Sequence, residues 1–146
     1  MGPSRYEESS TGAPARGGRP PPPGRREIGA RGERLAREHF ERLGFTIIDR
    51  NVRTRQGEID LVAYDGCTLV FAEVKTRWLN RGPEVSRTPL ERLGAQQRAR
   101  LRRLAGAWLS ERRPRPHARA VRLDAVGVTL DARLRLLGLE HIEAAW

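Results

Sequence analysis

The N-terminal segment of the chain is polar, and regularly spaced apolar residues appear only after it. Residues 1–24 are rich in Pro, Gly, Ser and Arg and nearly free of aliphatic side chains, and such a composition cannot bury enough apolar surface to fold. From residue 27 onward, apolar residues recur at helical spacing until Gly44, a residue type that commonly ends helices. Their positions are Ile28, Leu35, Ala36, Phe40 and Leu43. We therefore expect a disordered tail over residues 1–26 and a helix over residues 27–44.

Three strands are predicted next. Residues 45–48 form a short apolar run, and residues 58–64 and 67–77 are longer runs rich in β-branched and aromatic residues. Asp65-Gly66 lies between the two longer runs, and this dipeptide is a strong signal for a two-residue hairpin turn. The expected hairpin places Asp60 opposite Phe71 and Glu58 opposite Glu73.

A second helix and two closing strands complete the pattern. The helix is predicted over residues 90–109, before the sequence Arg-Pro-Arg-Pro, and the strands over residues 120–130 and 134–142. The apolar face of this helix contains Leu90, Leu93, Leu101, Leu104, Ala105 and Trp108. The predicted order is helix, three strands, helix, two strands, which describes one α/β domain over residues 27–146.

The predicted hairpin gathers acidic groups on one face. Because side chains alternate along a strand, Glu58, Asp60, Glu73 and Lys75 should share a face. The opposite face should hold Ile59, Leu61, Ala63, Val70, Ala72 and Val74. Carboxylates directly opposite each other on neighbouring strands repel, so a structural role alone does not favour this arrangement.

A bound divalent cation would remove the repulsion, because Mg²⁺ and Mn²⁺ prefer hard oxygen ligands. Asp60, Glu73 and Glu58 are the candidate metal ligands, and Lys75 would hold a water or neutralise a scissile phosphate. That chemistry is metal-assisted phosphodiester hydrolysis. Each residue also has a structural interpretation. Asp60 would cap a turn, Glu73 and Lys75 would form a half-exposed ion pair, and Glu58 would be an outer-sphere or merely exposed carboxylate.

The basic composition points to a polyanionic partner. Net charge is +10 with a pI near 11.4, which favours nucleic acid first and an anionic membrane surface second. Lys75 is the only lysine among 28 lysine and arginine residues, which suggests a position that arginine cannot serve. No apolar run is long enough to span a bilayer, and the single cysteine fits a reducing compartment. We expect a cytoplasmic protein with no membrane partner.

The arginines are concentrated in residues 87–122, which carry eleven arginines against two glutamates. Because no base-reading element is evident, we expect recognition of the nucleic-acid backbone or its shape. The expected contact residues are Arg77, Gln97, Arg98, Arg100, Arg102 and Arg103. Trp78, in the loop expected after Lys75, is best placed for base stacking.

The remaining polar and aromatic residues receive structural interpretations. His39, His117 and His141 lack metal-ligand spacing and are expected to be structural or exposed. Trp108 and Trp146 are expected to pack. Asp124 interrupts an apolar strand, where it either pairs with a neighbouring arginine or reaches the site.

The segments GEIDLVA (residues 57–63) and LVFAEVKTR (residues 69–77) resemble the YraN-type family of small bacterial proteins. The resemblance covers roughly residues 28–146. That family is similar to archaeal Holliday-junction resolvases and to other restriction-endonuclease-like nucleases with an Asp…(Asp/Glu)-x-Lys motif. The resemblance implies a restriction-endonuclease-like fold in which helices flank a central mixed sheet.

The resemblance also implies residue roles. Asp60 and Glu73 would bind Mg²⁺ or Mn²⁺, with the Val74 carbonyl as a further ligand, and Lys75 would act on the attacking water or the phosphate. Glu33 matches the catalytic glutamate of the family's first helix, although it could instead pair with Arg37 one turn on. Gln97 stands where the family often carries a lysine, so the second helix lacks the positive charge that the family has at this position.

The sequence therefore indicates a metal-dependent endonuclease acting on DNA, branched DNA included. A resolvase that cuts two strands across a two-fold axis would be a homodimer. The alternatives are a non-catalytic nucleic-acid-binding module with a nuclease-like fold, and an RNA- or ribosome-associated interaction protein.

Overall fold

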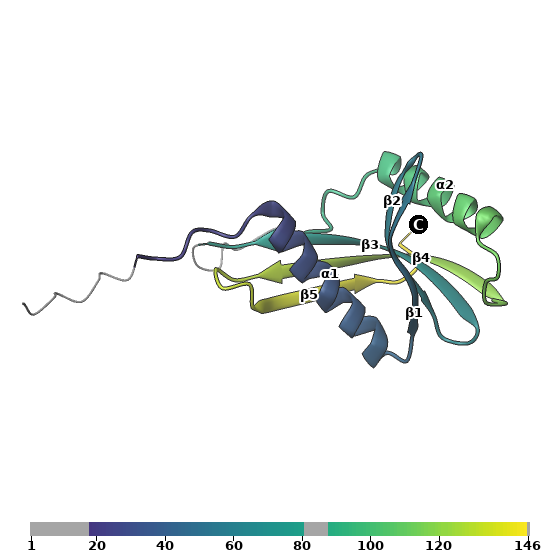
Figure 1. The fold of residues 1–146 in the computed structure, drawn as a ribbon, viewed down its shortest axis with the longest axis horizontal. Helices are drawn as coiled ribbons and strands as arrows, with labels where there is room; N and C mark the ends of the chain where they lie inside the picture. The colour runs from purple at the N-terminus through teal and green to yellow at the C-terminus, as the bar shows by residue number, and fades with distance from the viewer. Residues whose placement is uncertain (1–17, 81–87, 146) are drawn as a thin grey trace, which may run out of the picture.

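The protein forms a five-stranded sheet with one helix on each face (Figure 1). The computed structural model describes residues 18–80 and 88–145. Its elements are α1 (Arg25–Arg42), β1 (Thr46–Thr54), β2 (Gly57–Tyr64), β3 (Thr68–Trp78), α2 (Ala95–Glu111), β4 (Ala120–Leu130) and β5 (Leu136–Ile142). The predicted order of helices and strands is confirmed, and the architecture is consistent with a restriction-endonuclease-like fold.

The strands lie in sequence order across the sheet, from β1 at one edge to β5 at the other. β3 and β4 are parallel, whereas the other three neighbouring pairs are antiparallel. A parallel pair requires a crossover connection, and the segment that contains α2 provides it. The sheet is therefore mixed, as the resemblance implies.

Two separate apolar clusters hold the helices against the sheet. On one face, Leu35, Ala36 and Phe40 of α1 pack with strand residues that include Val70 and Val126. On the other face, Leu101, Leu104, Ala105 and Trp108 of α2 pack with Ile59, Val62, Leu69 and Phe71. The predicted apolar stripes of both helices are thus largely confirmed, although Leu43 lies beyond the end of α1 and is half exposed.

The start of α2 differs from the prediction. Gly94 is its N-cap, so Leu90 precedes the helix and packs instead on Gly127 of β4. A Cβ atom at Gly127 would lie 2.9 Å from Leu90 Cγ. Leu90 and Leu93 match the helical spacing only by coincidence. The helix begins directly after Gly94.

The hairpin between β2 and β3 turns one residue later than predicted. Tyr64 pairs with Leu69 and Leu61 with Ala72, so Gly66 and Cys67 form the turn in place of Asp65-Gly66. Asp65 Oδ1 accepts hydrogen bonds from the backbone N–H groups of Cys67 (2.9 Å) and Thr68 (2.6 Å). Gly66 supplies the positive φ of 96° at the first turn position. The predicted pairings Asp60–Phe71 and Glu58–Glu73 are therefore wrong.

The ribbon of β1 and β2 leaves the sheet beyond Leu61. Pairing of β2 with β3 is observed only from Leu61 to Tyr64, whereas pairing of β2 with β1 continues to Gly57. The free half of the ribbon turns toward α2 (Figure 1), and Ile59 joins the α2-side cluster while Leu61 joins the α1-side cluster. The prediction that Ile59 and Leu61 share a face is wrong, because the twist of the ribbon breaks the alternation at Asp60.

Candidate active site

The candidate site lies at the fork where β2 separates from β3. Asp60 is the first residue of β2 beyond the paired segment, and Glu73 is the next residue of β3 after Ala72, the partner of Leu61. The Asp60 side chain spans the opening, because its Oδ2 accepts a hydrogen bond from the Val74 backbone N–H at 2.8 Å. The fork therefore brings together the two carboxylates that the sequence singled out.

Asp60 is held in an environment that resists its ionisation. Burial, followed by the nearby carboxylates of Glu33, Glu73 and Glu58, raises the pKa of Asp60 to about 6, although the hydrogen bond from Val74 opposes the shift. The cluster of carboxylates expected from the strand pattern is thus present, and the Glu33 carboxylate of α1 is its fourth member.

Glu73 and Lys75 form an ion pair on β3, with Lys75 Nζ 2.9 Å from Glu73 Oε1. The two side chains differ in exposure, at 7% for Glu73 and 38% for Lys75. The carboxylate is therefore enclosed while the ammonium reaches solvent. Lys75 can meet an incoming anion without leaving the vicinity of Glu73.

Glu33 reaches the same group from α1. The preceding residue, Gly32, is buried against β3, and a Cβ there would overlap the Thr76 hydroxyl. This close approach brings the helix near the fork. Burial, despite a hydrogen bond from Asn51, raises the pKa of Glu33, and the Glu58 carboxylate adds to the shift.

Asn51 of β1 links two of the acids, and sequence reasoning missed it. With the amide nitrogen turned toward the carboxylates, it donates to Glu33 Oε2 (2.9 Å) and Glu58 Oε1 (3.0 Å). Its φ is 49°, a left-handed conformation in which asparagine is over-represented. Glu33 thus bonds to Asn51, and no ion pair with Arg37 is found in the described residues. The only sequence signal was an asparagine within a strand.

The expected face of acids is present only in part. Glu73 follows Leu69 and Phe71 on the α2 side of β3, whereas Asp60 lies at the break in the β2 alternation and its carboxylate points across the fork to β3. Glu58 is near the group through Asn51. The acids therefore converge because the strands separate, and the alternation of side chains along a strand does not by itself account for their positions.

The predicted nucleic-acid contacts lie mainly on α2. Arg98, Arg100, Arg102 and Arg103 are exposed there, and Arg77 follows Lys75 by two residues on β3. The half-buried Gln97 accepts a hydrogen bond from the Gly94 backbone N–H (3.0 Å) and so caps α2. Arg87 lies outside the described residues. Nucleic-acid contact by these residues stays a prediction.

The structure confirms some of the predictions for the tryptophan and histidine residues and contradicts one of them. Trp78 is the last residue of β3 and packs partly against the α1-side cluster, so its prediction as a loop residue is wrong. Trp108 packs against Phe71 at a ring-centroid distance of 5.4 Å, as expected. His117 is exposed, and Trp146 lies outside the described residues.

A second aspartate, the fully buried Asp124 of β4, has its own complete set of partners. It accepts hydrogen bonds from Arg122 Nε and Nη2 (both 2.8 Å), His141 Nε2 (2.8 Å) and the Ala144 backbone N–H (3.0 Å). His141 Nδ1 in turn lies 3.0 Å from His39 Nε2. The pairing of Asp124 with a neighbouring arginine is confirmed, and His39 and His141 are structural.

The donor chemistry of the fork fits a small divalent cation held partly by its substrate. In the described ranges, no three Asp, Glu, His or Cys side chains are grouped to hold a metal by themselves. Mg²⁺, however, commonly takes one or two carboxylates and completes its shell with water and substrate phosphate oxygens. Asp60 and Glu73 supply two such carboxylates beside the Val74 backbone.

No helix in the described part of the chain is long and apolar enough to cross a membrane.

Comparison with known proteins identifies relatives for most of the chain. Residues 32–128 match the uncharacterised protein family UPF0102. A UPF0102 protein of Beutenbergia cavernae is 46% identical over 119 residues, covering 79% of this chain and 92% of the relative. One of Mycolicibacterium vanbaalenii is 42% identical over 119 residues, covering 82% and 93%. The match includes the fork and its acids, and the chain belongs to the UPF0102 family, whose YraN-like members it resembles.

Proposed function

We propose that this protein is a metal-dependent nuclease that hydrolyses phosphodiester bonds in DNA, branched DNA included. The observation that carries the proposal is the fork, where Glu73 pairs with Lys75 and where burial, followed by the nearby carboxylates, raises the pKa of Asp60 to about 6. A carboxylate that serves stability alone would be paired with a cation, as Asp124 is, whereas no ion pair of Asp60 is found in the described residues. Asp60 and Glu73 would hold Mg²⁺ or Mn²⁺, with Glu58 in an outer position.

The chemistry supplied by such a cation is neutralisation of phosphate charge and activation of a water. The residues of the chain have complementary tasks. The Val74 N–H orients Asp60, and Glu73 holds Lys75 where its exposed ammonium can contact a phosphate oxygen or the attacking water. Asn51 keeps the Glu33 and Glu58 carboxylates separated from each other by an amide.

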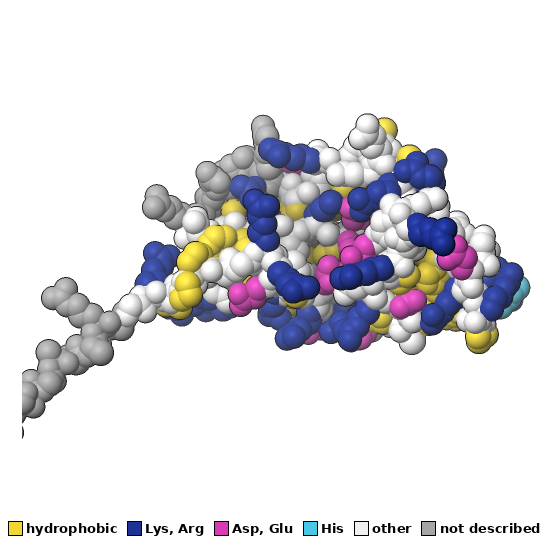
Figure 2. All heavy atoms as spheres, turned by 45° about the horizontal axis from the view of Figure 1, so that its top comes forward, with side chains coloured by type: hydrophobic (Ala, Val, Ile, Leu, Met, Phe, Trp, Pro, Cys, Tyr) yellow, Lys and Arg dark blue, Asp and Glu magenta, His cyan; other side chains and the backbone are white. Residues whose placement is uncertain are grey.

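The surface around the site supports a nucleic-acid substrate. Arg34, Arg37 and Arg50 border the same pocket as Glu33 and Asp60 and form a basic rim beside the acids. Figure 2 shows basic side chains around acidic ones near the middle of one face. A basic rim attracts a polyanion through its phosphates, without reading sequence. The rim thus brings a backbone to the acids, which would repel it in the absence of a cation.

The test is incubation of the purified protein with junction, flap, single-stranded and duplex DNA, and with matched RNA, in Mg²⁺, Mn²⁺ or EDTA. We expect cleavage with metal, loss of cleavage in EDTA, and loss in Asp60→Ala and Lys75→Ala. Tight binding without cleavage of any substrate would favour the non-catalytic binding module. Cleavage or binding restricted to RNA would instead support the alternative of an RNA- or ribosome-associated protein.

A further inference from the structure

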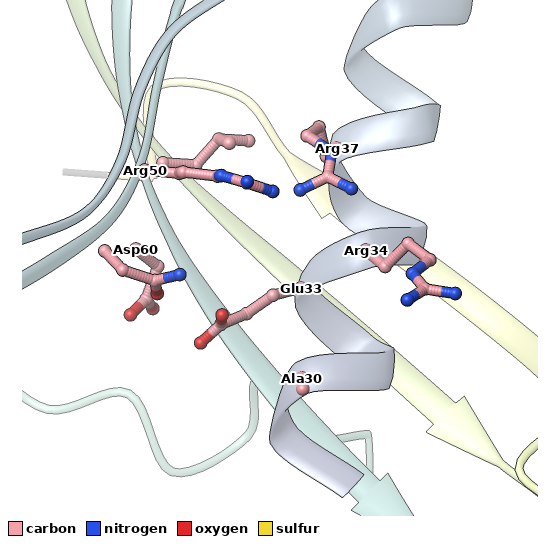
Figure 3. Close-up of a pocket in the computed structure, with 8 residues that line it drawn as sticks. Ala30, Glu33, Arg34, Arg37, Arg50 and Asp60 are labelled. Carbon is pink, nitrogen blue, oxygen red and sulfur yellow. The ribbon is translucent and has the colours of Figure 1, made fainter. Parts of the chain in front are cut away.

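A small pocket between α1 and β1 adjoins the acids of the fork. It encloses about 180 Å³, and the residues that border it include Glu33, Arg37, Arg50, Asn51 and Asp60, with the exposed Arg34 at its edge. In Figure 3 the side chains of Arg37 and Arg50 point toward one another from the two elements, while Glu33 extends toward the side of Asp60. The pocket therefore has a cationic side and an acidic side.

Within residues 18–80 and 88–145, Arg37 and Arg50 have no acidic partner. In the part of the chain that the structure describes, no ion pair joins Arg37 or Arg50 to a carboxylate, and Glu33 bonds to Asn51. Two guanidiniums that point into one pocket repel each other, and arginine is always charged. An anion between them would convert this repulsion into attraction on both sides.

We propose that Arg37 and Arg50 form a phosphate-binding subsite next to the reacting centre. This inference rests on the proposed nuclease function and names one contact of its substrate. A phosphate suits the pair because guanidinium forks bind phosphate oxygens through paired hydrogen bonds. A strand with one phosphate here has an adjacent linkage close to Asp60, since Asp60 borders the same pocket.

The subsite is separate from the arginine-rich helix that the sequence emphasised. α2 packs on the opposite face of the sheet from α1, whereas Arg37 and Arg50 come from α1 and β1 and border the acids directly. The α2 arginines would attract the polyanion generally, and the pair in the pocket would fix the register of one strand. The phosphate is either an internal linkage or a terminal group of the strand.

The first test measures binding without catalysis. The double variant Arg37→Gln/Arg50→Gln is compared with Arg42→Gln/Arg133→Gln, which removes the same charge from exposed positions, and circular dichroism checks the fold of both. Affinity for fluorescent DNA is measured in EDTA over a range of salt. We expect about a tenfold loss for the pocket variant, with a salt-dependence slope smaller by about 0.7–0.9 than that of the control, as for one lost phosphate contact.

The second test locates the phosphate. Single linkages of the DNA are replaced in turn by neutral methylphosphonates, and one position should weaken binding by the intact protein but not by the pocket variant. Circular single-stranded DNA, and linear strands with 5′-phosphate or 5′-hydroxyl ends, separate an internal linkage from a terminal phosphate. Either location supports the subsite.

The outcomes separate this inference from the proposed function. If the intact protein binds and cleaves DNA, but the pocket variant matches the control in affinity, slope and linkage pattern, the subsite is refuted and the nuclease proposal survives. If the pocket variant shows the expected losses while no metal or substrate gives cleavage, the subsite stands as part of a binding module. Failure of the intact protein to bind any nucleic acid overturns both.

Discussion

Two aspartates in the same sheet, the half-buried Asp60 and the fully buried Asp124, have opposite electrostatic environments. Asp124 is fully buried, and burial would raise its pKa, but hydrogen bonds from His141, Arg122 and the Ala144 N–H lower the pKa below its ordinary value. Among the described residues, Asp60 receives a hydrogen bond only from the Val74 N–H, so burial, followed by the nearby acids, raises its pKa to about 6. A carboxylate that serves the fold is compensated by its neighbours, whereas Asp60 is left with unsatisfied negative charge.

The same contrast separates the basic residues beside them. Arg122 donates two parallel hydrogen bonds of 2.8 Å to Asp124, a geometry for which the guanidinium is suited. Lys75 contacts Glu73 through one ammonium and reaches solvent. The only lysine of the chain therefore lies where a compact, mobile cation is useful and a rigid fork is not.

The largest effect on stability is expected at Asp124. Asp124→Asn removes the charge that holds Arg122 and His141, and breaking a buried pair typically costs about 3–5 kcal/mol. We expect the free energy of unfolding in urea to fall by about that amount. Asp131→Asn, where the partner Arg135 is exposed, is the matched control and should have a much smaller effect. Equal losses in both variants would contradict the comparison.

The next largest effect is expected on the rate of DNA cleavage. Lys75→Arg keeps the charge but replaces the compact ammonium with a broad fork, and we expect cleavage to slow by about a hundredfold, the lower end for loss of a positioned proton-transfer group. Thermal melting should change little, because Lys75 is part exposed. The reverse change, Arg122→Lys, should lower the melting temperature and leave the rate nearly intact. Full activity in Lys75→Arg would show that charge alone matters there.

A smaller effect on stability, in this case a gain, is expected on substitution of Asp60. Because the folded protein holds a proton on Asp60 more tightly than the unfolded chain does, the wild-type protein should lose stability as pH rises through about 4 to 6. In EDTA, Asp60→Asn should therefore be more stable than wild type by about 1–3 kcal/mol at pH 8. The two proteins should be nearly equal at pH 3.5, where both side chains are neutral. Melting curves at the two pH values measure this difference, and an Asp60→Asn protein that is less stable at pH 8 would count against the cluster of carboxylates.

The smallest effect is expected at Asn51. Asn51→Asp adds a carboxylate between Glu33 and Glu58, and we expect about 1 kcal/mol of destabilisation at pH 8 that disappears when the acids are protonated. Asn51→Gly tolerates the φ of 49° while removing the amide, so it separates the backbone requirement from the hydrogen bonds. Identical stability of Asn51→Asp and Asn51→Gly at pH 8 would argue against the amide bridge.

Much of the fold was predictable from local patterns. The order of elements, the bounds of β4 and the apolar stripe of α2 follow from hydrophobic period, and Gly44 ends α1 with a positive φ of 91°. The site residues Asp60, Glu73 and Lys75 were identifiable because charged groups rarely interrupt such apolar strands.

The remaining features depend on tertiary structure. The separation of β2 from β3 needs the twist of the β1–β2 ribbon and its packing on α2, which no strand period encodes. Asn51 and the pocket with Arg37 and Arg50 depend on how close α1 approaches the sheet at Gly32. The turn at Gly66-Cys67 was set by the hydrogen bonds of Asp65, so it shifted the register by two residues and kept the parity.

The most direct measurement of the central claim is calorimetric titration of Mn²⁺ into the metal-free protein, alone and bound to a cleavage-resistant phosphorothioate DNA. The account predicts saturable binding that strengthens with DNA and is lost in Asp60→Asn and Glu73→Gln, with little change in the control Asp131→Asn. Absence of binding in both states, or binding that persists in Asp60→Asn, would contradict a cation site at the fork.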